Sequence, residues 1–370
     1  MWHARLSAPL AIAAGSSALA VGVAVTGASA GGASRTGAIA DAQKLAYVSA
    51  SRLELDVVNA DGSGRKRLTR CQSASVCRIG ELAWSPGAGR IAFYRGLWHR
   101  NMSLFVINAD GSRLKRLGLC GIDCRRPSWA SDGSAIAFSR GGAVFIVTTR
   151  TAKVRRLTRC APPTCWDASP AWSPAGRVGR IVFARRDTSG TTLYAVDLAH
   201  ASMLMELAKV PGRAANIAWS PDRMRIAYDF ADGASESVHV MNVDGSDLTV
   251  VASGPTGSGP GMPSWSPDGT SIAYFNTPRV ANGFFEPEVW TVRRDGTAPR
   301  RLFHADCCLS DWVPPSWSAD GTEVAFAYSG TLGTPGGERV GGTFLLRTDG
   351  TGVRRLGDAV SELAPKPTPR

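Results

Sequence analysis

Side chains that commonly carry catalysis or bind metal ions are few and scattered in this chain of 370 residues. The chain has five histidines, at His3, His99, His200, His239 and His304. His239 lies in an apolar run typical of a buried strand. His99 and His304 fall on connections that could meet at one surface. A metal centre needs several ligands at close spacing, and acid–base catalysis needs positioned groups. We therefore expect no metal site and no cofactor.

Acidic residues recur in Asp-Gly pairs, which raises the alternative of calcium binding. In the second turn of the repeat the pairs are Asp61-Gly62, Asp110-Gly111, Asp244-Gly245, Asp295-Gly296 and Asp349-Gly350. Calcium loops place oxygen ligands at alternate positions and end in a bidentate acid, whereas the motif Asn-Ala-Asp-Gly-Ser supplies too few ligands. Glycine supplies the positive φ that a tight hairpin requires. The pairs therefore predict hairpin turns.

The elements that must position any site repeat along the chain. Six segments start at a tryptophan, pass through a small polar turn and end in a short apolar strand: Trp84–Phe93, Trp129–Phe138, Trp172–Phe183, Trp219–Tyr228, Trp265–Tyr274 and Trp317–Phe326. The tryptophans are 45, 43, 47, 46 and 52 residues apart. This period is typical of four-stranded propeller blades. A second apolar run follows each segment, as in Leu104–Ile107, and completes a pair of strands.

The predicted fold class is all-β, a β-propeller of four-stranded blades. Seven blades are favoured, because Lys44–Val48 and Leu55–Val58 open the series without a tryptophan strand; six blades with a terminal extension are the alternative. The missing strand is expected from the C-terminus, since Glu362–Pro367 aligns with Glu81–Pro86. This strand would close the first blade, and closure is needed because each blade is stable only against its neighbours.

The two ends of the chain flank the propeller. We assign residues 1–30 to a signal peptide, 31–43 to a linker, 44–364 to the propeller and 365–370 to a tail. A basic start and an apolar stretch precede Ala28-Ser29-Ala30, which fits the small-residue rule for cleavage. A retained membrane anchor is the alternative, but its many Gly, Ser and Ala residues make it a poor membrane helix. We expect an exported protein, secreted or associated with the cell envelope, without a stable membrane span.

Net charge points to the class of partner. The chain has a formal net charge of +12 at pH 7, and removal of Arg5 with the leader would leave a net charge of +11. Such a surface favours anionic partners, among them cell-wall polymers, and export makes nucleic acid the least suitable. Basic pairs also end five repeats: Lys66-Arg67, Lys115-Arg116, Arg155-Arg156, Arg300-Arg301 and Arg354-Arg355. We interpret them first as protection of exposed sheet edges, with a ligand surface as the alternative.

The repeat resembles that of the TolB-like β-propellers, relatives of WD repeats. The shared signature is Trp-Ser-Pro-Asp-Gly-x-x-Ile-Ala-Phe, a further strand, Asp-Gly and Arg-Leu-Thr, and the match runs from residue 44 to about residue 357. One repeat departs from it, with Asp222-Arg223 in place of Asp-Gly. The resemblance implies the fold strongly and the activity weakly, because the family includes interaction scaffolds, propellers of prolyl-oligopeptidase-type peptidases and some sugar lyases. No Gly-x-Ser-x-Gly elbow follows the repeats, so a complete peptidase is not expected.

Eight cysteines fall in four close pairs: Cys71 and Cys77, Cys120 and Cys124, Cys160 and Cys165, Cys307 and Cys308. Each pair lies between the outermost strand of one repeat and the tryptophan strand of the next. The even count, the expected export and the spacing favour disulfides. Metal binding is the alternative, but the spacing and histidine support typical of zinc are missing.

The loops opposite the Asp-Gly turns vary between repeats and hold the candidate ligand-binding residues. They are Trp98, His99, Arg100, Arg125, Arg126, Trp166, Asp167, Phe284, Phe285, Glu286, His304, Asp306, Asp311 and Trp312. Aromatic and charged groups on rigid loops around a funnel suit binding. We expect a non-catalytic monomer that binds an envelope protein or an anionic cell-wall polymer. The alternative is a glycan-active lyase or hydrolase that uses funnel residues.

Overall fold

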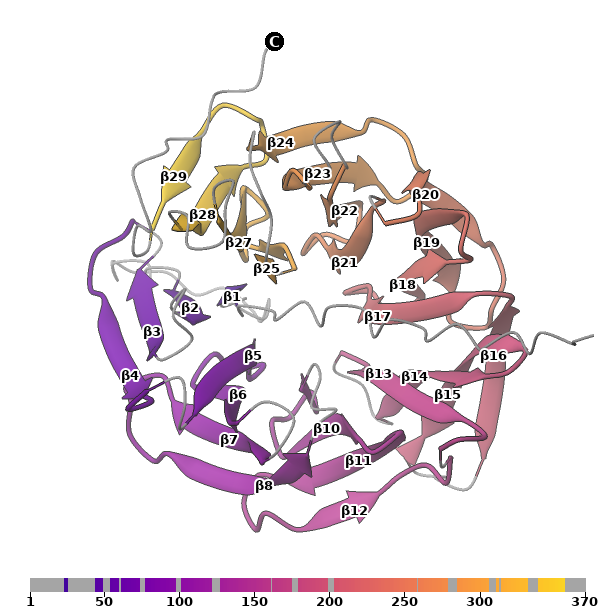
Figure 1. Cartoon of the computed structure of the whole chain (residues 1–370), viewed down its shortest axis with the longest axis horizontal. Helices are drawn as coiled ribbons and strands as arrows, with labels where there is room; N and C mark the ends of the chain where they lie inside the picture. The colour runs from indigo at the N-terminus through magenta and orange to yellow at the C-terminus, as the bar shows by residue number, and fades with distance from the viewer. Residues whose placement is uncertain are drawn as a thin grey trace, which may run out of the picture.

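The computed structural model of the chain describes residues 23–25, 44–48, 54–59, 61–73, 77–97, 101–121, 127–160, 162–174, 179–198, 203–257, 259–278, 285–305, 311–312, 314–331 and 339–356. These residues form antiparallel sheets arranged as seven blades around a central axis (Figure 1). The predicted β-propeller and its seven blades are therefore confirmed. Within these ranges, no helix is long and apolar enough to cross a membrane.

The first four blades follow chain order around the ring. Blade 1 consists of β1 (Val23–Val25), β2 (Lys44–Val48), β3 (Glu54–Asn59) and β4 (Lys66–Arg70). Blade 2 consists of β5 (Arg78–Trp84), β6 (Arg90–Gly96), β7 (Met102–Asn108) and β8 (Lys115–Gly121). Blade 3 consists of β9 (Ser128–Trp129), β10 (Ala135–Arg140), β11 (Ala143–Thr148) and β12 (Val154–Arg156). Blade 4 consists of β13 (Trp166–Trp172), β14 (Arg180–Asp187), β15 (Gly190–Asp197) and β16 (Leu204–Val210).

Three further blades complete the ring. Blade 5 consists of β17 (Arg213–Trp219), β18 (Arg225–Ala231), β19 (Ser235–Asn242) and β20 (Thr249–Pro255). Blade 6 consists of β21 (Gly261–Trp265), β22 (Ser271–Asn276), β23 (Glu288–Arg293) and β24 (Arg300–His304). Blade 7 consists of β25 (Asp311–Trp312), β26 (Ser316–Trp317), β27 (Glu323–Thr331), β28 (Arg339–Arg347) and β29 (Val353–Arg355). Its inner strand is in two pieces, because β25 and β26 both pair with β27.

The inner strand of blade 1 differs from the prediction. The sequence predicted a C-terminal strand at Glu362–Pro367, but β1 occupies this place and pairs with β2, with Val23 opposite Tyr47 and Val25 opposite Leu45. The short apolar run Val23–Val25 can extend the sheet because the inner edge of β2 offers unpaired backbone groups. Residues 357–370, which include the predicted strand, lie outside the described residues.

The core lies between blades. The second strand of each repeat is buried on both faces because neighbouring blades cover it; Ile91, Phe93 and Phe326 are fully buried examples. Each such side chain contributes about 2 kcal/mol of hydrophobic stabilisation. One cluster unites Leu45 of blade 1 with Phe93 of blade 2 and Leu345 of blade 7. Blade 1 therefore packs against both neighbours, which closes the ring.

The repeat tryptophans link successive blades. The indole Nε1 of Trp129 donates a hydrogen bond to the carbonyl of Ala83 (3.0 Å), the residue before the tryptophan of the previous blade. The same bond joins Trp219 to Ala171 at 2.9 Å. Equivalent bonds join Trp265 to Ala218 and Trp317 to Ser264. A buried carbonyl without a hydrogen-bond partner lowers the stability of the fold. This bond therefore explains why tryptophan stands at this position of the repeat.

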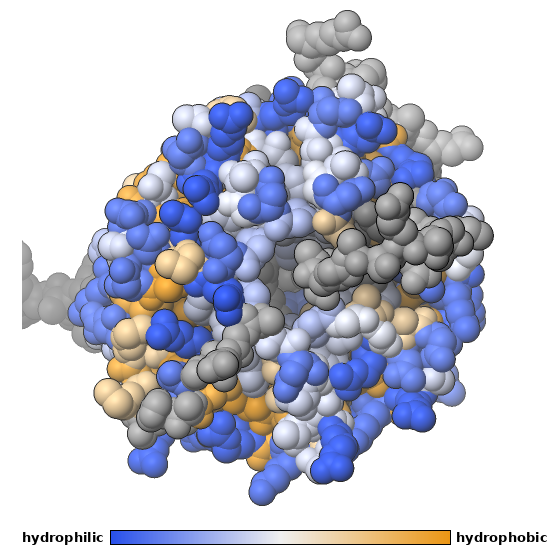
Figure 2. All heavy atoms as spheres, turned by 180° about the vertical axis from the view of Figure 1, so that it is seen from behind, coloured by the Kyte–Doolittle hydropathy of each residue, from blue (hydrophilic) through white to orange (hydrophobic). Residues whose placement is uncertain are grey.

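The turns after the first and the third strand of each blade, which include most of the Asp-Gly pairs, lie on one face of the disc, here called the turn face, and the other connections form the loop face. In blade 2, the carboxylate of Asp110 accepts hydrogen bonds from the backbone nitrogen and the hydroxyl of Ser112, at 2.8 and 2.6 Å. This confirms the predicted hairpin turns. Arg223, which replaces glycine in blade 5, takes the positive φ of 65° that Gly269 has at 68° in blade 6. The departure from the signature therefore changes the residue and keeps the turn. Figure 2 shows one face as space-filling atoms.

We expect the propeller to lose stability in acid through these turns. Hydrogen bonds from Ser63, Ser112, Ser246, Thr297 and Thr351 lower the pKa of Asp61, Asp110, Asp244, Asp295 and Asp349 below the usual value of 3.8. A lowered folded-state pKa contributes stability that is present above the unfolded value and is lost as pH falls through the folded value. The melting temperature should therefore fall below about pH 4. Thermal unfolding followed by circular dichroism at several pH values measures this.

The matched control replaces the five aspartates with asparagine. Asparagine keeps the turn but does not titrate. The variant should show a shallower loss of melting temperature in acid than the natural chain. An unchanged slope would assign acid sensitivity to other carboxylates.

Candidate functional site

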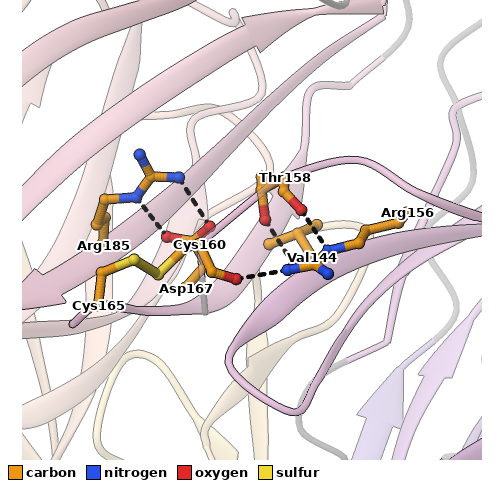
Figure 3. The surroundings of a disulfide bond; sticks show 7 residues. All are labelled: Val144, Arg156, Thr158, Cys160, Cys165, Asp167 and Arg185. Carbon is orange, nitrogen blue, oxygen red and sulfur yellow. Dashed lines mark hydrogen bonds and ion pairs between the residues drawn. A yellow bond between two sulfur atoms is a disulfide. The ribbon is translucent and has the colours of Figure 1, made fainter. Parts of the chain in front are cut away.

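Disulfides fasten two of the connections on the loop face. Cys71 pairs with Cys77 and Cys160 with Cys165, each with a Cα–Cα distance of 5.6 Å. Figure 3 shows that the second disulfide is tied to β12, because Arg156 donates hydrogen bonds to the carbonyls of Thr158 (2.7 Å) and Cys160 (2.6 Å). Both pairings were predicted. Cys120 is also in a disulfide, while its predicted partner Cys124 and the pair Cys307 and Cys308 lie outside the described residues.

Asp167 and Trp166, two predicted site residues, begin β13. Asp167 is fully buried and forms a two-pronged ion pair with Arg185 on β14, with Nε–Oδ1 at 2.7 Å and Nη2–Oδ2 at 2.9 Å (Figure 3). This pair raises the pKa of the Arg185 guanidinium. Trp166 is partly exposed and packs over Gly142, where an added Cβ would lie 3.3 Å from its Cδ2 atom. Asp167 therefore has a structural partner within its own blade.

Glu286 and His304, also predicted, come together at the loop-face end of blade 6. The imidazole Nε2 of His304 lies 3.6 Å from Glu286 Oε2, and its Nδ1 lies 3.6 Å from Glu288 Oε1. The buried Glu288 also accepts hydrogen bonds from Arg301, Asn276 and Trp290. These bonds hold one carboxylate in place, and Phe285 precedes the group on the chain. In the described part of the chain, no group of three or more His, Cys, Asp or Glu could hold a metal ion.

The other predicted site residues cannot be placed. Trp98, His99, Arg100, Arg125, Arg126, Phe284 and Asp306 lie outside the described residues. Asp311 and Trp312 are described only as the backbone of β25. For all of them, ligand binding stays a prediction.

Sequence reasoning did not single out a cleft between blades 1 and 2. The cleft has a volume of about 510 Å³ and is lined by Arg70, Gln72, Cys77, Arg95, Gly96, Asn101, Ser103, Phe105 and Arg116. Three of the nine lining residues are arginines and none is acidic. A surface of this composition suits an anionic ligand, because guanidinium groups offer several fixed donors to carboxylates and phosphates.

The arginines of the cleft are held by neighbouring groups. Arg95 on β6 reaches across to blade 1 and donates to Thr69 Oγ1 (3.3 Å) and to the carbonyl of Arg70 (3.2 Å). Arg116 on β8 donates through Nε to the buried hydroxyl of Ser103 at 3.1 Å. Both side chains keep further N–H groups, since a guanidinium has five. Restraint of this kind lowers the entropy lost when a ligand binds.

An aromatic ring and the two ends of a loop complete the cleft. Phe105 stacks on Phe93, with ring centroids 5.8 Å apart, and lies opposite Arg116 in the β7–β8 register. The backbone nitrogen of Leu97 donates to Asn101 Oδ1 at 2.7 Å. Gly96 and Asn101 therefore form the two roots of the loop that carries the predicted residues Trp98, His99 and Arg100. The predicted loop residues and the cleft adjoin along the chain.

Comparison with solved structures identifies the architecture. TolB from Acinetobacter baumannii superposes with a TM-score of 0.56 at 18% identity, over 74% of this chain and 66% of that chain. The fold is that of a TolB-like β-propeller. A prolyl endopeptidase is similar to it with a TM-score of 0.61 at 13% identity, over 91% of this chain and 50% of that chain. Oligogalacturonate lyase from Vibrio parahaemolyticus superposes with a TM-score of 0.55 at 10% identity, over 92% of this chain and 86% of that chain.

Other comparisons add nothing to the assignment. No protein-family model and no curated protein matches the chain. The similar structures include a TolB, a peptidase and a lyase, so the likeness shows the fold and leaves the activity open.

Charge is divided unevenly around the TolB-like propeller. Residues 44–165, which form blades 1 to 3 and their connections, contain 21 Lys and Arg against 7 Asp and Glu. Residues 166–356 contain 17 against 20. The basic character of the chain therefore resides in one part of the ring, and the arginine cleft lies within that part.

Proposed function

We propose that this protein is an exported, non-catalytic binding protein that holds an anionic polymer of the cell envelope on blades 1 to 3. The observation that carries the proposal is the cleft formed by Arg70, Arg95 and Arg116, which has no acidic lining residue. The surrounding excess of basic residues would attract the same polymer over a longer range. Arg95 and Arg116 would then anchor one charged unit of it, since Arg70 is paired with Glu54 (Nε–Oε1 3.4 Å).

Three features support the cell envelope as the place of action. The N-terminal sequence has the pattern of a signal peptide. Two disulfides are formed within the described residues, and disulfides persist in oxidising compartments. The architecture is also that of TolB. Processing of the leader and the identity of the partner belong to the proposal.

A glycan-active lyase or hydrolase is the alternative function. It rests on His304, which lies 3.6 Å from Glu286 and 3.6 Å from Glu288 on the loop face. These groups could move a proton, but Glu288 is already engaged by Arg301 (2.8 Å) and by two further donors. An assay for unsaturated or reducing ends released from an anionic glycan tests this alternative. Release by the natural chain that is lost in His304→Ala would favour the enzyme over the binding protein.

Binding of two polymer classes tests the proposal. Polygalacturonate supplies carboxylates and inorganic polyphosphate supplies phosphates, with dextran as a neutral control. We expect Arg95→Gln combined with Arg116→Gln to weaken binding of the preferred polymer at least tenfold, because a charge-assisted hydrogen bond contributes about 1.5–3 kcal/mol. Biolayer interferometry at low and high salt measures the dissociation constant.

The matched control removes two charges from the same part of the ring outside the cleft. Arg150→Gln combined with Lys153→Gln, both exposed in blade 3, should weaken binding by less than about threefold, since diffuse charge contributes little per residue at moderate salt. Equal losses in both double variants would show that no defined site exists. No binding of either polymer at low salt would overturn the proposed function.

A further inference from the structure

Blades 2 and 5 carry the same turn with opposite charge. Blade 2 has Asp110-Gly-Ser-Arg113-Leu114-Lys115, and blade 5 has Asp244-Gly-Ser-Asp247-Leu248-Thr249. The backbones agree, since Arg113 and Asp247 have positive φ angles of 55° and 53°. The leucine that follows is exposed in both turns, with 43% of its surface accessible for Leu114 and 53% for Leu248. Each turn therefore presents an exposed leucine. The leucine lies next to a cation in blade 2 and next to an anion in blade 5.

Around Leu248 the surface is apolar and acidic. The outer strands of blades 4 and 5 lack the basic pair that the other five blades carry, and their surroundings expose Met203, Leu204, Met205, Met224 and Val250. Blades 4 and 5 join near these residues, because the turn at Gly245 packs against the backbone of Leu207 on β16. Within blade 5, Val243 donates a hydrogen bond to the carbonyl of Met224, which holds the two turns of that blade together. The exposed acids of this region are Glu206, Asp222, Asp244 and Asp247, which outnumber its exposed bases, Lys209 and Arg223. We name it the acidic apolar edge.

Figure 2 shows hydrophobic surface along the left side of the ring. Because Figure 2 is turned by 180° from Figure 1, this is the side on which Figure 1 shows β16, at the right. Residues 166–260, which form blades 4 and 5, contain 8 Lys and Arg against 10 Asp and Glu. Methionine side chains adapt to irregular partners, and exposed apolar patches mark interaction sites. An outer strand without a basic pair also lacks the protection against pairing that the other blades have.

Around Leu114 the surface is apolar and basic. Leu119 and Val154 are exposed there, at 49% and 37% of their surface. Blades 2 and 3 join at this point, because an added Cβ on Gly118 would lie 3.4 Å from Val154 Cγ2. Arg113, Lys115 and Arg155 are neighbours of these apolar residues along the chain and are exposed, and they outnumber the one exposed acid of the turn, Asp110. We name this region the basic apolar edge.

We infer that the acidic apolar edge binds the basic apolar edge of a second copy of this protein. Opposite charges and apolar side chains face each other in such a contact, so its charges steer association and its leucines and methionines exclude water. The two edges belong to different blades, which makes the contact heterologous, and repeated contacts would build rings or chains of molecules. Such an array would present many arginine clefts to one polymer. The prediction of a monomer would then hold only for dilute protein.

Sedimentation equilibrium of the full chain tests this inference. At about 100 µM protein and about 50 mM salt, we expect the weight-average mass to rise to at least about twice that of the 39.0 kDa chain. Salt at about 0.5 M should return it to the monomer, because exposed charges are then screened. A monomer mass at every concentration in low salt would overturn the inference.

Charge reversal identifies the surfaces. Asp247→Arg with Glu206→Arg makes both edges basic, and Arg113→Asp with Arg155→Glu makes both edges acidic. Each double variant alone should stay monomeric, whereas an equimolar mixture of the two should associate. Arginine is tolerated at position 247 because Arg113 already adopts that backbone geometry. Association of either variant alone, or none in the mixture, would refute the pairing, and neither pair of changes touches the arginine cleft.

Discussion

Deleting residues 1–30 together with 358–370 should destabilise the propeller far more than either deletion alone. The full chain closes blade 1 with β1, whose residues Val23–Val25 fall inside the segment predicted to be removed on export. Once that segment is gone, the inner edge of β2 has unpaired backbone groups. The segment Glu362–Pro367 aligns with the inner strand of blade 2 and is the candidate to replace β1.

The expected size of the effect follows from the bonds at stake. A short strand supplies about three backbone hydrogen bonds of about 1 kcal/mol each and covers neighbouring apolar groups. Loss of both candidate strands should therefore cost about 3–5 kcal/mol, or about 10 °C in melting temperature, whereas each single deletion should cost less than about 3 °C. Thermal unfolding of the full chain, both single deletions and the double deletion measures this.

Each outcome has a distinct meaning. A large loss from the first deletion alone would make β1 a permanent strand, which contradicts removal of the leader in the folded protein. A double deletion no worse than the single ones would show that the ring needs no closing strand. Only a loss well beyond the sum of the single losses supports exchange between the two segments.

The fold could be predicted from the sequence because each repeated residue has a local physical reason. Trp219 reaches the carbonyl of Ala171 in the previous blade, and Asp110 closes its own turn with Ser112. Both reasons recur with the period of a blade, so the pattern is visible without coordinates. Strand β1 has no such signal: three apolar residues inside a longer apolar stretch carry neither a turn motif nor the repeat period.

The cleft could not be predicted for a different reason. Arg70, Arg95 and Arg116 come from different strands of two blades. Arg116 belongs to a basic pair that also has a structural explanation, namely protection of the sheet edge. The structure separates the members of this pair: Lys115 donates to the carbonyl of Thr149 in blade 3 (3.1 Å), and Arg116 lines the cleft. A signal in the sequence existed, because Phe105 and Arg116 recur as an aromatic–basic pair in other blades, such as Phe344 and Arg355.

Removing the positive partner of Asp167 should destabilise the chain by about 3 kcal/mol. Asp167 is fully buried, and Arg185 neutralises it through two hydrogen bonds of 2.7 and 2.9 Å. The guanidinium also lies over the ring of Tyr194, with its Cζ atom 5.1 Å from the centroid. Arg185→Met keeps much of the side-chain volume but leaves a buried carboxylate without its cation, which typically costs about 3–5 kcal/mol. Urea unfolding measures the loss as a lower midpoint at unchanged slope.

A double-mutant cycle separates the pair from the packing around it. Asp167→Ala combined with Arg185→Met removes both charges, and replacement of a whole buried ion pair by apolar groups is often neutral. The double variant should therefore be more stable than Arg185→Met alone. Additive losses would mean that packing against Tyr194, rather than charge neutralisation, explains the effect of Arg185. In the same variants, unchanged polymer binding would assign Asp167 a structural role, and a loss of binding at unchanged stability would restore it as a ligand-binding residue.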